Sequence, residues 1–173
     1  MRDKKMLKWA IYTVIVLLTA VFQGTPHFLP VITSVMPLIV IPCVITIAMF
    51  EGETAGAAFG IFGGLLWDIE NGRVFGFNAF FLMLMCVLVS LLIQNLFRNT
   101  IVSCVLFCAC AAFIQQVVTW FFFVYLAGSE QFLVSLFRII LPTVAYTVLF
   151  ELLFYFLIKY INKKFKDSIA GID

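Results

Sequence analysis

The sequence predicts an all-α membrane protein, a bundle of six transmembrane helices that forms one integral membrane domain over residues 1–173. The chain is 64% hydrophobic and 12% charged, whereas about 25% of the residues of a typical soluble domain are charged. Its mean hydropathy is +1.15, and no stretch is polar and long enough to form a separate soluble domain. A helix needs about 20 mostly apolar residues to cross about 30 Å of hydrocarbon, so the chain has room for about six spans.

The apolar runs, separated by charge, proline or glycine, define the elements in order. They predict spans at residues 7–23, 31–50, 54–69, 77–96, 101–127 and 132–160. The third span is the least regular, because it follows the "EGE" of residues 51–53 directly and would cover only about 24 Å. Without it the chain would have five spans, and its two ends would face opposite sides of the membrane.

Basic residues at both ends of the chain decide between five and six spans. The front carries Arg2, Lys4, Lys5 and Lys8, and the back carries Lys159, Lys163, Lys164 and Lys166. The positive-inside rule places both ends in the cytoplasm and therefore requires an even number of spans. Arg98 also falls on the inside in this arrangement, whereas Arg73 and Arg138 fall near the outside, against the rule.

The third predicted span carries glycine at every fourth position, at Gly56, Gly60 and Gly64, with Gly63 beside them. Residues four apart form one oblique ridge of a helix, so these glycines leave a groove in which a second backbone can lie very close. Two hypotheses follow. The groove packs against a helix of the same chain, or it receives a helix of a partner protein, or it does both.

Asp68 continues this spacing and is followed by Gly72, Gly76 and Asn78. A carboxylate at the C-terminal end of a helix is disfavoured by the helix dipole by about 0.3–1 kcal/mol, so it needs compensating partners. Arg73, the side-chain amide of Asn78 and free backbone N–H groups of the turn are candidates. We expect Asp68 to link the turn to the helix and so fix the third and fourth spans as a pair; a ligand or proton site is the alternative.

Glu151 lies inside the last predicted span. An ionisable group at such a position is by default a candidate functional residue. The alternative is an interhelical contact, for which Arg138 and the Gln115/Gln116 pair are the candidate partners. Pro142, near the start of this span, and Pro37 and Pro42, in the second, predict kinks.

No catalytic or metal-binding pattern stands out. The sequence has no GxSxG, HExxH or P-loop motif, which argues against an enzyme and against a bound cofactor. The five cysteines lie inside apolar runs, with no CxxC pair and one histidine in the whole chain. This pattern predicts neither a zinc site nor disulfides but buried small apolar residues. They are Cys43, Cys86, Cys104, Cys108 and Cys110.

The motif Gly56-xxx-Gly60-xxx-Gly64-xxx-Asp68-xxx-Gly72-xxx-Gly76-x-Asn78, in a chain of this size with basic ends, resembles the MreD family of rod shape-determining proteins. The resemblance implies an integral protein of the bacterial cell membrane that belongs to the cell-elongation machinery. Its implied partners are MreC, the actin-like MreB, and the RodA and penicillin-binding-protein pair that builds peptidoglycan. It also implies a fold similar to the substrate-binding membrane subunits of energy-coupling-factor vitamin transporters.

Two functions of different classes remain open at this point. In the first, the protein is a non-catalytic scaffold that holds the membrane helix of MreC and supports peptidoglycan synthesis through contact. In the second, it is a small-molecule, vitamin-type binding subunit of a transporter. Those subunits carry an Ala-xxx-Ala pattern on their first span, whereas Ala10 is followed at i+4 by Val14 here, which favours the scaffold.

Overall fold

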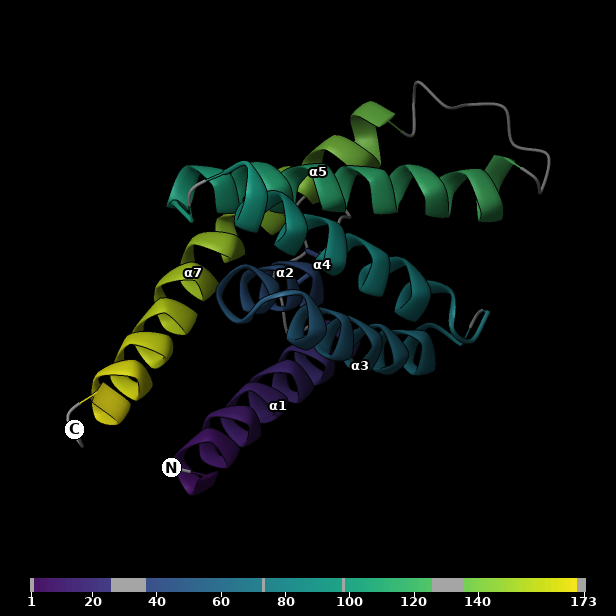
Figure 1. Ribbon diagram of the computed structural model, residues 1–173. Helices are drawn as coiled ribbons and strands as arrows, with labels where there is room; N and C mark the ends of the chain where they lie inside the picture. Colours follow the sequence, from purple (N-terminus) through teal and green to yellow (C-terminus); the bar gives the residue numbers. More distant parts are fainter. Residues whose placement is uncertain (1, 26–36, 73, 98, 126–135, 171–173) are drawn as a thin grey trace.

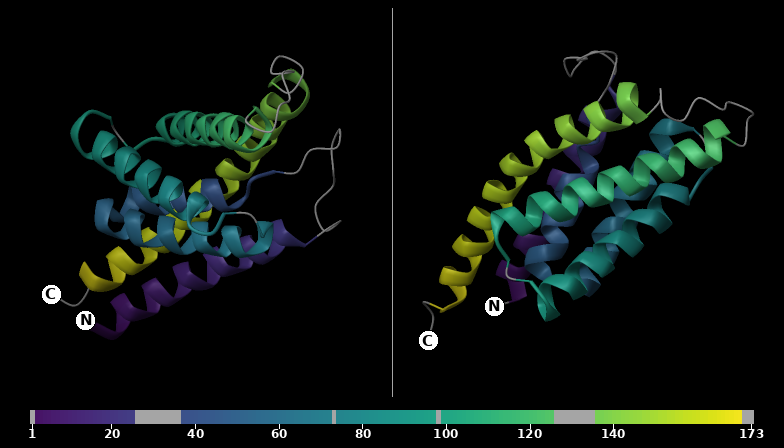
Figure 2. Two further views of the ribbon diagram at one scale, coloured as in Figure 1. Left: turned by 90° about the vertical axis from the view of Figure 1, so that its right-hand side faces the viewer. Right: turned by 90° about the horizontal axis from the view of Figure 1, so that it is seen from above.

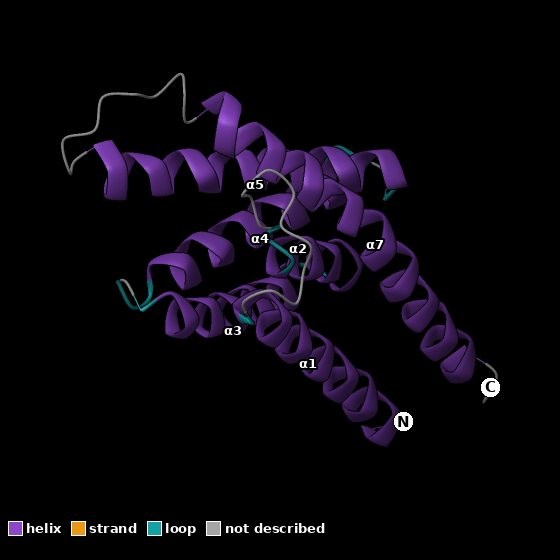
Figure 3. Ribbon diagram, turned by 180° about the vertical axis from the view of Figure 1, so that it is seen from behind, coloured by secondary structure: helices purple, strands orange, loops and turns teal. Residues whose placement is uncertain are grey.

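The computed structural model describes residues 2–25, 37–72, 74–97, 99–125 and 136–170, and helices are the only regular elements in these ranges (Figures 1 and 3). The helices are α1 (Arg2–Gly24), α2 (Val40–Glu51), α3 (Glu53–Asn71), α4 (Phe77–Asn95), α5 (Ile101–Trp120) and α7 (Leu141–Ala170). Two π-helical turns, η1 (Phe121–Tyr125) and η2 (Leu136–Ile140), follow α5 and precede α7. The all-helical membrane class predicted from the sequence agrees with these elements.

Four of these helices are long and apolar enough to cross a membrane: Met6–Gly24, Phe77–Asn95, Ile101–Phe123 and Phe137–Phe165. The second predicted span is wrong in length, because α2 begins at Val40 and has 12 residues, which cover about 18 Å; residues 31–36 lie outside the described ranges. Helix α3 has 19 residues, but its carboxylates and glycines lower its hydropathy. Full crossing by all six helices therefore stays a prediction.

Helix α2 is the centre of the bundle. It packs against α1, α3, α4, α5 and α7, and ten of its residues, Val40 through Met49, are buried. A helix that is apolar on all sides is stable only when it is buried on all sides, which accounts for its uniform composition. Pro42 lies in its first turn, where no intrahelical N–H bond is lost, so the kink predicted there is not needed.

The remaining helices surround α2 (Figure 1). Helices α1 and α7 lie on either side of it, and both chain termini lie at the same end of the bundle in every view (Figures 1 and 2). Helices α3 and α4 form the most extensive pair. Pro142 is the second residue of α7, and the π-helical turn η2 ends two residues before it. Because a proline ring clashes with the carbonyl four residues earlier, the widened turn accommodates it.

Candidate functional site

The glycines of α3 mark where other helices of the same chain approach it. A Cβ added at Gly64 would lie 2.3 Å from the Cα of Ala79, and one added at Gly60 would lie 2.9 Å from the carbonyl oxygen of Leu82. Both contacts are to backbone atoms of α4, so no side-chain rotation could make room. The two backbones are as close as the oblique glycine ridge allows.

Gly56 and Gly63 face α2 instead. Their added Cβ atoms would lie 2.6 Å from the Cβ of Ala48 and 2.9 Å from a methyl carbon of Val44. The groove is therefore filled along its length by α4 and α2. This geometry favours the hypothesis that the groove packs within the chain, and docking of a partner's helix on α3 stays a prediction.

Asp68 joins the end of α3 to the beginning of α4. It is 3% exposed. One carboxylate oxygen accepts hydrogen bonds from the backbone N–H of Gly76 (2.9 Å) and of Ala79 (3.3 Å). The other accepts from the backbone N–H (3.1 Å) and the side-chain amide (2.8 Å) of Asn78. Each oxygen thus has two donors, which leaves the carboxylate little capacity to bind a cation or another donor.

Three of these four donors are free N–H groups of the first turn of α4. A carboxylate at that position caps the helix and interacts favourably with the positive end of its dipole. The unfavourable position of Asp68 at the C-terminal end of α3 is therefore compensated by the N-terminus of α4. Arg73, also a candidate partner, lies outside the described residues.

Gly72 and Gly76 give the turn its backbone conformation. Their φ angles are +59° and +91°, in the left-handed region that side chains with a Cβ disfavour. No atom outside their immediate neighbours lies within 4 Å of a Cβ added at either residue, so backbone conformation and not crowding selects glycine there. The turn places the N–H of Gly76 toward Asp68.

Asn78 extends this contact to α5. Its side-chain oxygen accepts a hydrogen bond from the amide nitrogen of Gln115, which is 1% exposed. Asp68, Asn78 and Gln115 thus form one buried polar cluster that connects α3, α4 and α5. The adjacent Gln116 lines a small cavity, which Asn78 also lines.

Glu151 lies in a second buried cluster. Its side chain is 0% exposed, and one carboxyl oxygen is hydrogen-bonded to the hydroxyl of Thr46 (2.8 Å) and to the thiol of Cys104. These contacts connect α7 with α2 and α5. The predicted partners are wrong: Arg138 is exposed at the start of the last helical segment, and Gln115 is bonded to Asn78.

The five cysteines differ in their burial. Cys43, Cys86, Cys104 and Cys108 are buried and free, as the apolar runs predict, but Cys110 is exposed on the outer face of α5. The thiol of Cys104 also has a polar contact that its apolar neighbours in sequence do not indicate. Among the described residues, no group of three or more His, Cys, Asp or Glu side chains is arranged to hold a metal ion.

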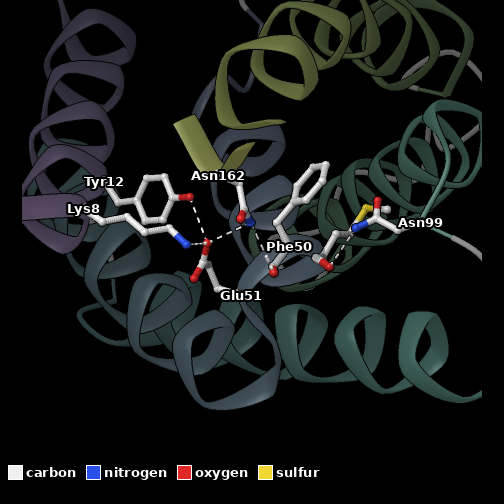
Figure 4. Close-up of polar contacts among 7 residues, drawn as sticks. Lys8, Tyr12, Phe50, Glu51, Asn99 and Asn162 are labelled. Atoms are coloured by element: carbon white, nitrogen blue, oxygen red, sulfur yellow. Dashed lines mark hydrogen bonds and ion pairs between the residues drawn. The ribbon is translucent and has the colours of Figure 1, made fainter. Parts of the chain in front are cut away.

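A third cluster surrounds Glu51, which the sequence suggested only as part of a short connection (Figure 4). One oxygen of Glu51 lies 2.6 Å from the ammonium of Lys8 and accepts hydrogen bonds from Tyr12 (2.9 Å) and Asn162 (3.1 Å). These residues come from α2, α1 and α7. The sequence signal that could have revealed the cluster is the pairing of two opposite charges, each at the end of an apolar run.

The ends of α2 are satisfied by side chains of other elements, as a helix buried within a bundle requires. At its start the N–H of Val40 donates to the side-chain oxygen of Gln23 (3.0 Å). At its end the carbonyls of Met49 and Phe50 accept from the side-chain amides of Asn99 (3.1 Å) and Asn162 (3.5 Å) (Figure 4). No sequence pattern indicated these contacts, because each partner is distant along the chain.

The family model described as "rod shape-determining protein MreD" matches residues 3–165. The chain belongs to the MreD family. No curated protein and no solved structure matches it, so the implied likeness to vitamin-transporter subunits stays a prediction.

Two cavities of this MreD family member are candidate sites for a small-molecule ligand. One, of about 190 Å³, is lined by aromatic and polar side chains of α3, α4, α5 and η1, with Leu38 and Val74. A second, of about 330 Å³, is an apolar groove between α1 and α7. None of the three carboxyl groups described above lines either cavity. The carboxyl groups of this MreD family member are therefore held in contacts between helices, and Asn78, which binds Asp68, also lines the smaller cavity.

Proposed function

We propose that this protein is a non-catalytic membrane scaffold of the bacterial cell-elongation machinery, which holds MreC and thereby supports peptidoglycan synthesis and rod shape. Membership of the MreD family, over residues 3–165, is the observation that carries the proposal. RodA with its penicillin-binding protein is the next partner in this proposal, and MreB is an indirect one.

The arrangement of buried polar groups supports a role through contact. Asp68 and Glu51 are occupied by donors of neighbouring helices. In a bilayer, helices associate mainly through close packing and hydrogen bonds, so a bundle linked in this way presents its outer surface in a defined arrangement. A scaffold needs such a surface and no reactive group.

The proposed location is the plasma membrane, with both termini in the cytoplasm. Both termini lie at the same end of the bundle (Figure 1). Lys8 lies at this end on α1, and the exposed Lys163 and Lys164 lie near it on α7. The positive-inside rule supports this orientation.

Because α4 and α2 fill the glycine groove, the proposed contact with MreC uses a different surface. The lipid-facing sides of the four candidate spans are available, and each carries an exposed leucine: Leu18 on α1, Leu88 on α4, Leu106 on α5 and Leu153 on α7. A photoreactive amino acid at each of these positions, in cells that express tagged MreC, tests the proposal directly. Leu82, which is 0% exposed on α4, is the matched control.

We expect a crosslinked product that contains MreC from at least one exposed position and none from Leu82. MreC should also co-purify with the protein in mild detergent. Absence of both the crosslink and the co-purification, with the protein present at its normal level, would contradict the proposal.

The vitamin-binding alternative is not favoured. The mixed polar and aromatic cavity measures about 190 Å³, whereas small-molecule sites have volumes of about 300–1,000 Å³. The larger groove offers no polar atoms to orient a vitamin.

A further inference from the structure

Glu151 is placed where a charge is least favourable. It lies midway along the candidate span Phe137–Phe165, about 21 Å from either end, and it is fully buried. Carboxylates at such depths pair with a cation or give up their charge by taking up a proton. The state of this side chain therefore depends on what surrounds it.

Among the side chains that the structure describes, no cation is paired with Glu151. The ion pair between Lys8 and Glu51 is the one found among the described residues. The titratable side chains that accompany Glu151 from the helices packed against it are thiols: Cys43 on α2, and Cys104 and Cys108 on α5. In the part of the chain that the structure describes, one carboxyl oxygen has no hydrogen bond of normal geometry, and the thiol of Cys108 is the other polar group that faces the carboxyl. A carboxylate would leave its charge uncompensated here.

The number of protons available for the hydrogen bonds around Glu151 also indicates a protonated carboxyl group. Three of the polar contacts at this site compete for protons: Thr46 hydroxyl to the Pro42 carbonyl (2.8 Å), Thr46 hydroxyl to Glu151 (2.8 Å), and Cys104 thiol to Glu151. Each hydrogen bond needs one proton. Thr46 and Cys104 bring one each, so a carboxylate would leave one of the three contacts without a proton. A carboxylic acid supplies the third.

We propose that Glu151 is a proton-binding site, whose carboxyl group holds a proton at neutral pH and donates it to the hydroxyl of Thr46. Thr46 then donates to the Pro42 carbonyl, and Cys104 donates to the carboxyl group. The result is a hydrogen-bond chain from α7 to α2, joined by α5, that carries no net charge. The oxygen without a normal hydrogen bond is then a neutral carbonyl oxygen, which is less costly to bury than a carboxylate oxygen.

Infrared spectroscopy of the purified, full-length protein in lipid at pH 7 tests the proposal. A protonated carboxyl group has a carbonyl stretching band that a carboxylate lacks, so the spectrum of the unmodified protein minus that of Glu151→Gln should contain this band. Glu51→Gln is the matched control, because Glu51 is paired with Lys8. Its difference spectrum should contain the carboxylate bands instead.

Carboxylate bands in the Glu151→Gln difference spectrum at pH 7 would overturn the proposal. If Glu151→Gln does not fold, the unmodified protein labelled with 13C at the glutamate side-chain carboxyl replaces it. The acid band should then move to the lower frequency of the labelled group. A labelled protein that shows no acid band at pH 7 would equally overturn the proposal.

Discussion

Replacing Asp68 by alanine should destabilise the α3–α4 pair strongly. The substitution leaves four donors without an acceptor, and two of the backbone donors belong to the buried residues Asn78 and Ala79. A buried unsatisfied donor costs about 1–3 kcal/mol, and the loss of a helix cap alone costs about 0.5–2 kcal/mol. Because the donors share one site and relax together, we expect a total loss of about 3–5 kcal/mol.

The assay is thermal unfolding of the detergent-purified protein. In a domain of this size, a loss of 1 kcal/mol lowers Tm by about 2–4 °C, so Asp68→Ala should lower it by about 6–20 °C. The Tm of Asp68→Asn should lie between those of Asp68→Ala and the unmodified protein. Its amide oxygen still accepts two of the hydrogen bonds, while its NH₂ group faces two donors.

Glu70→Ala is the matched control, since it removes an exposed carboxylate two residues away on the same helix. We expect its effect to stay within about 0.5 kcal/mol. If Asp68→Ala unfolds at the same temperature as Glu70→Ala, Asp68 does not stabilise the turn, and the compensation of its charge by the N-terminus of α4 is wrong.

Close packing at α3, the buried ion pair and the contact at the end of α2 can each be tested by the same measurement of Tm. Gly64→Ala should lower the free energy of unfolding by about 1–3 kcal/mol, because the added Cβ meets the backbone of Ala79. Ala58→Leu is the control, since Ala58 lies on the exposed side of α3, and this variant should unfold at the same temperature as the unmodified protein. Lys8→Met and Glu51→Gln, combined in a double-mutant cycle, should show a coupling of about 0.5–3 kcal/mol, and strictly additive losses of Tm would argue against the ion pair. Asn99→Ala should lower Tm by removing a hydrogen bond worth about 1 kcal/mol to the end of α2, and an unchanged Tm would contradict that role.

The positions of the helices were largely readable from the sequence, because long apolar runs and glycine spacing are local signals. The length of α2 could not be predicted from such signals. An apolar run has the same appearance whether it faces lipid or is buried among other helices, and α2 is buried on all sides. Hydropathy therefore predicted a full span where the structure has a short central helix.

Contacts near in sequence were easier to predict than distant ones. Asp68 and Asn78 are ten residues apart and are joined by one turn, so the residues of that turn predicted their contact. Glu151 bonds to Thr46, which is 105 residues away, and its other partner is a cysteine, a residue whose burial in an apolar run suggests only packing. No local pattern contains that information.

The three carboxyl clusters together explain how the bundle is held in an apolar solvent that provides little hydrophobic drive between helices. Glu51 connects α1, α2 and α7; Glu151 connects α2, α5 and α7; the cluster of Asp68, Asn78 and Gln115 connects α3, α4 and α5. Because neighbouring clusters share a helix, they form a single network that reaches all six helices. The glycine ridge of α3 adds close packing where α4 and α2 meet α3. Loss of one cluster should therefore loosen a particular set of helices and leave the others associated, which distinguishes this network from a bundle held by packing alone.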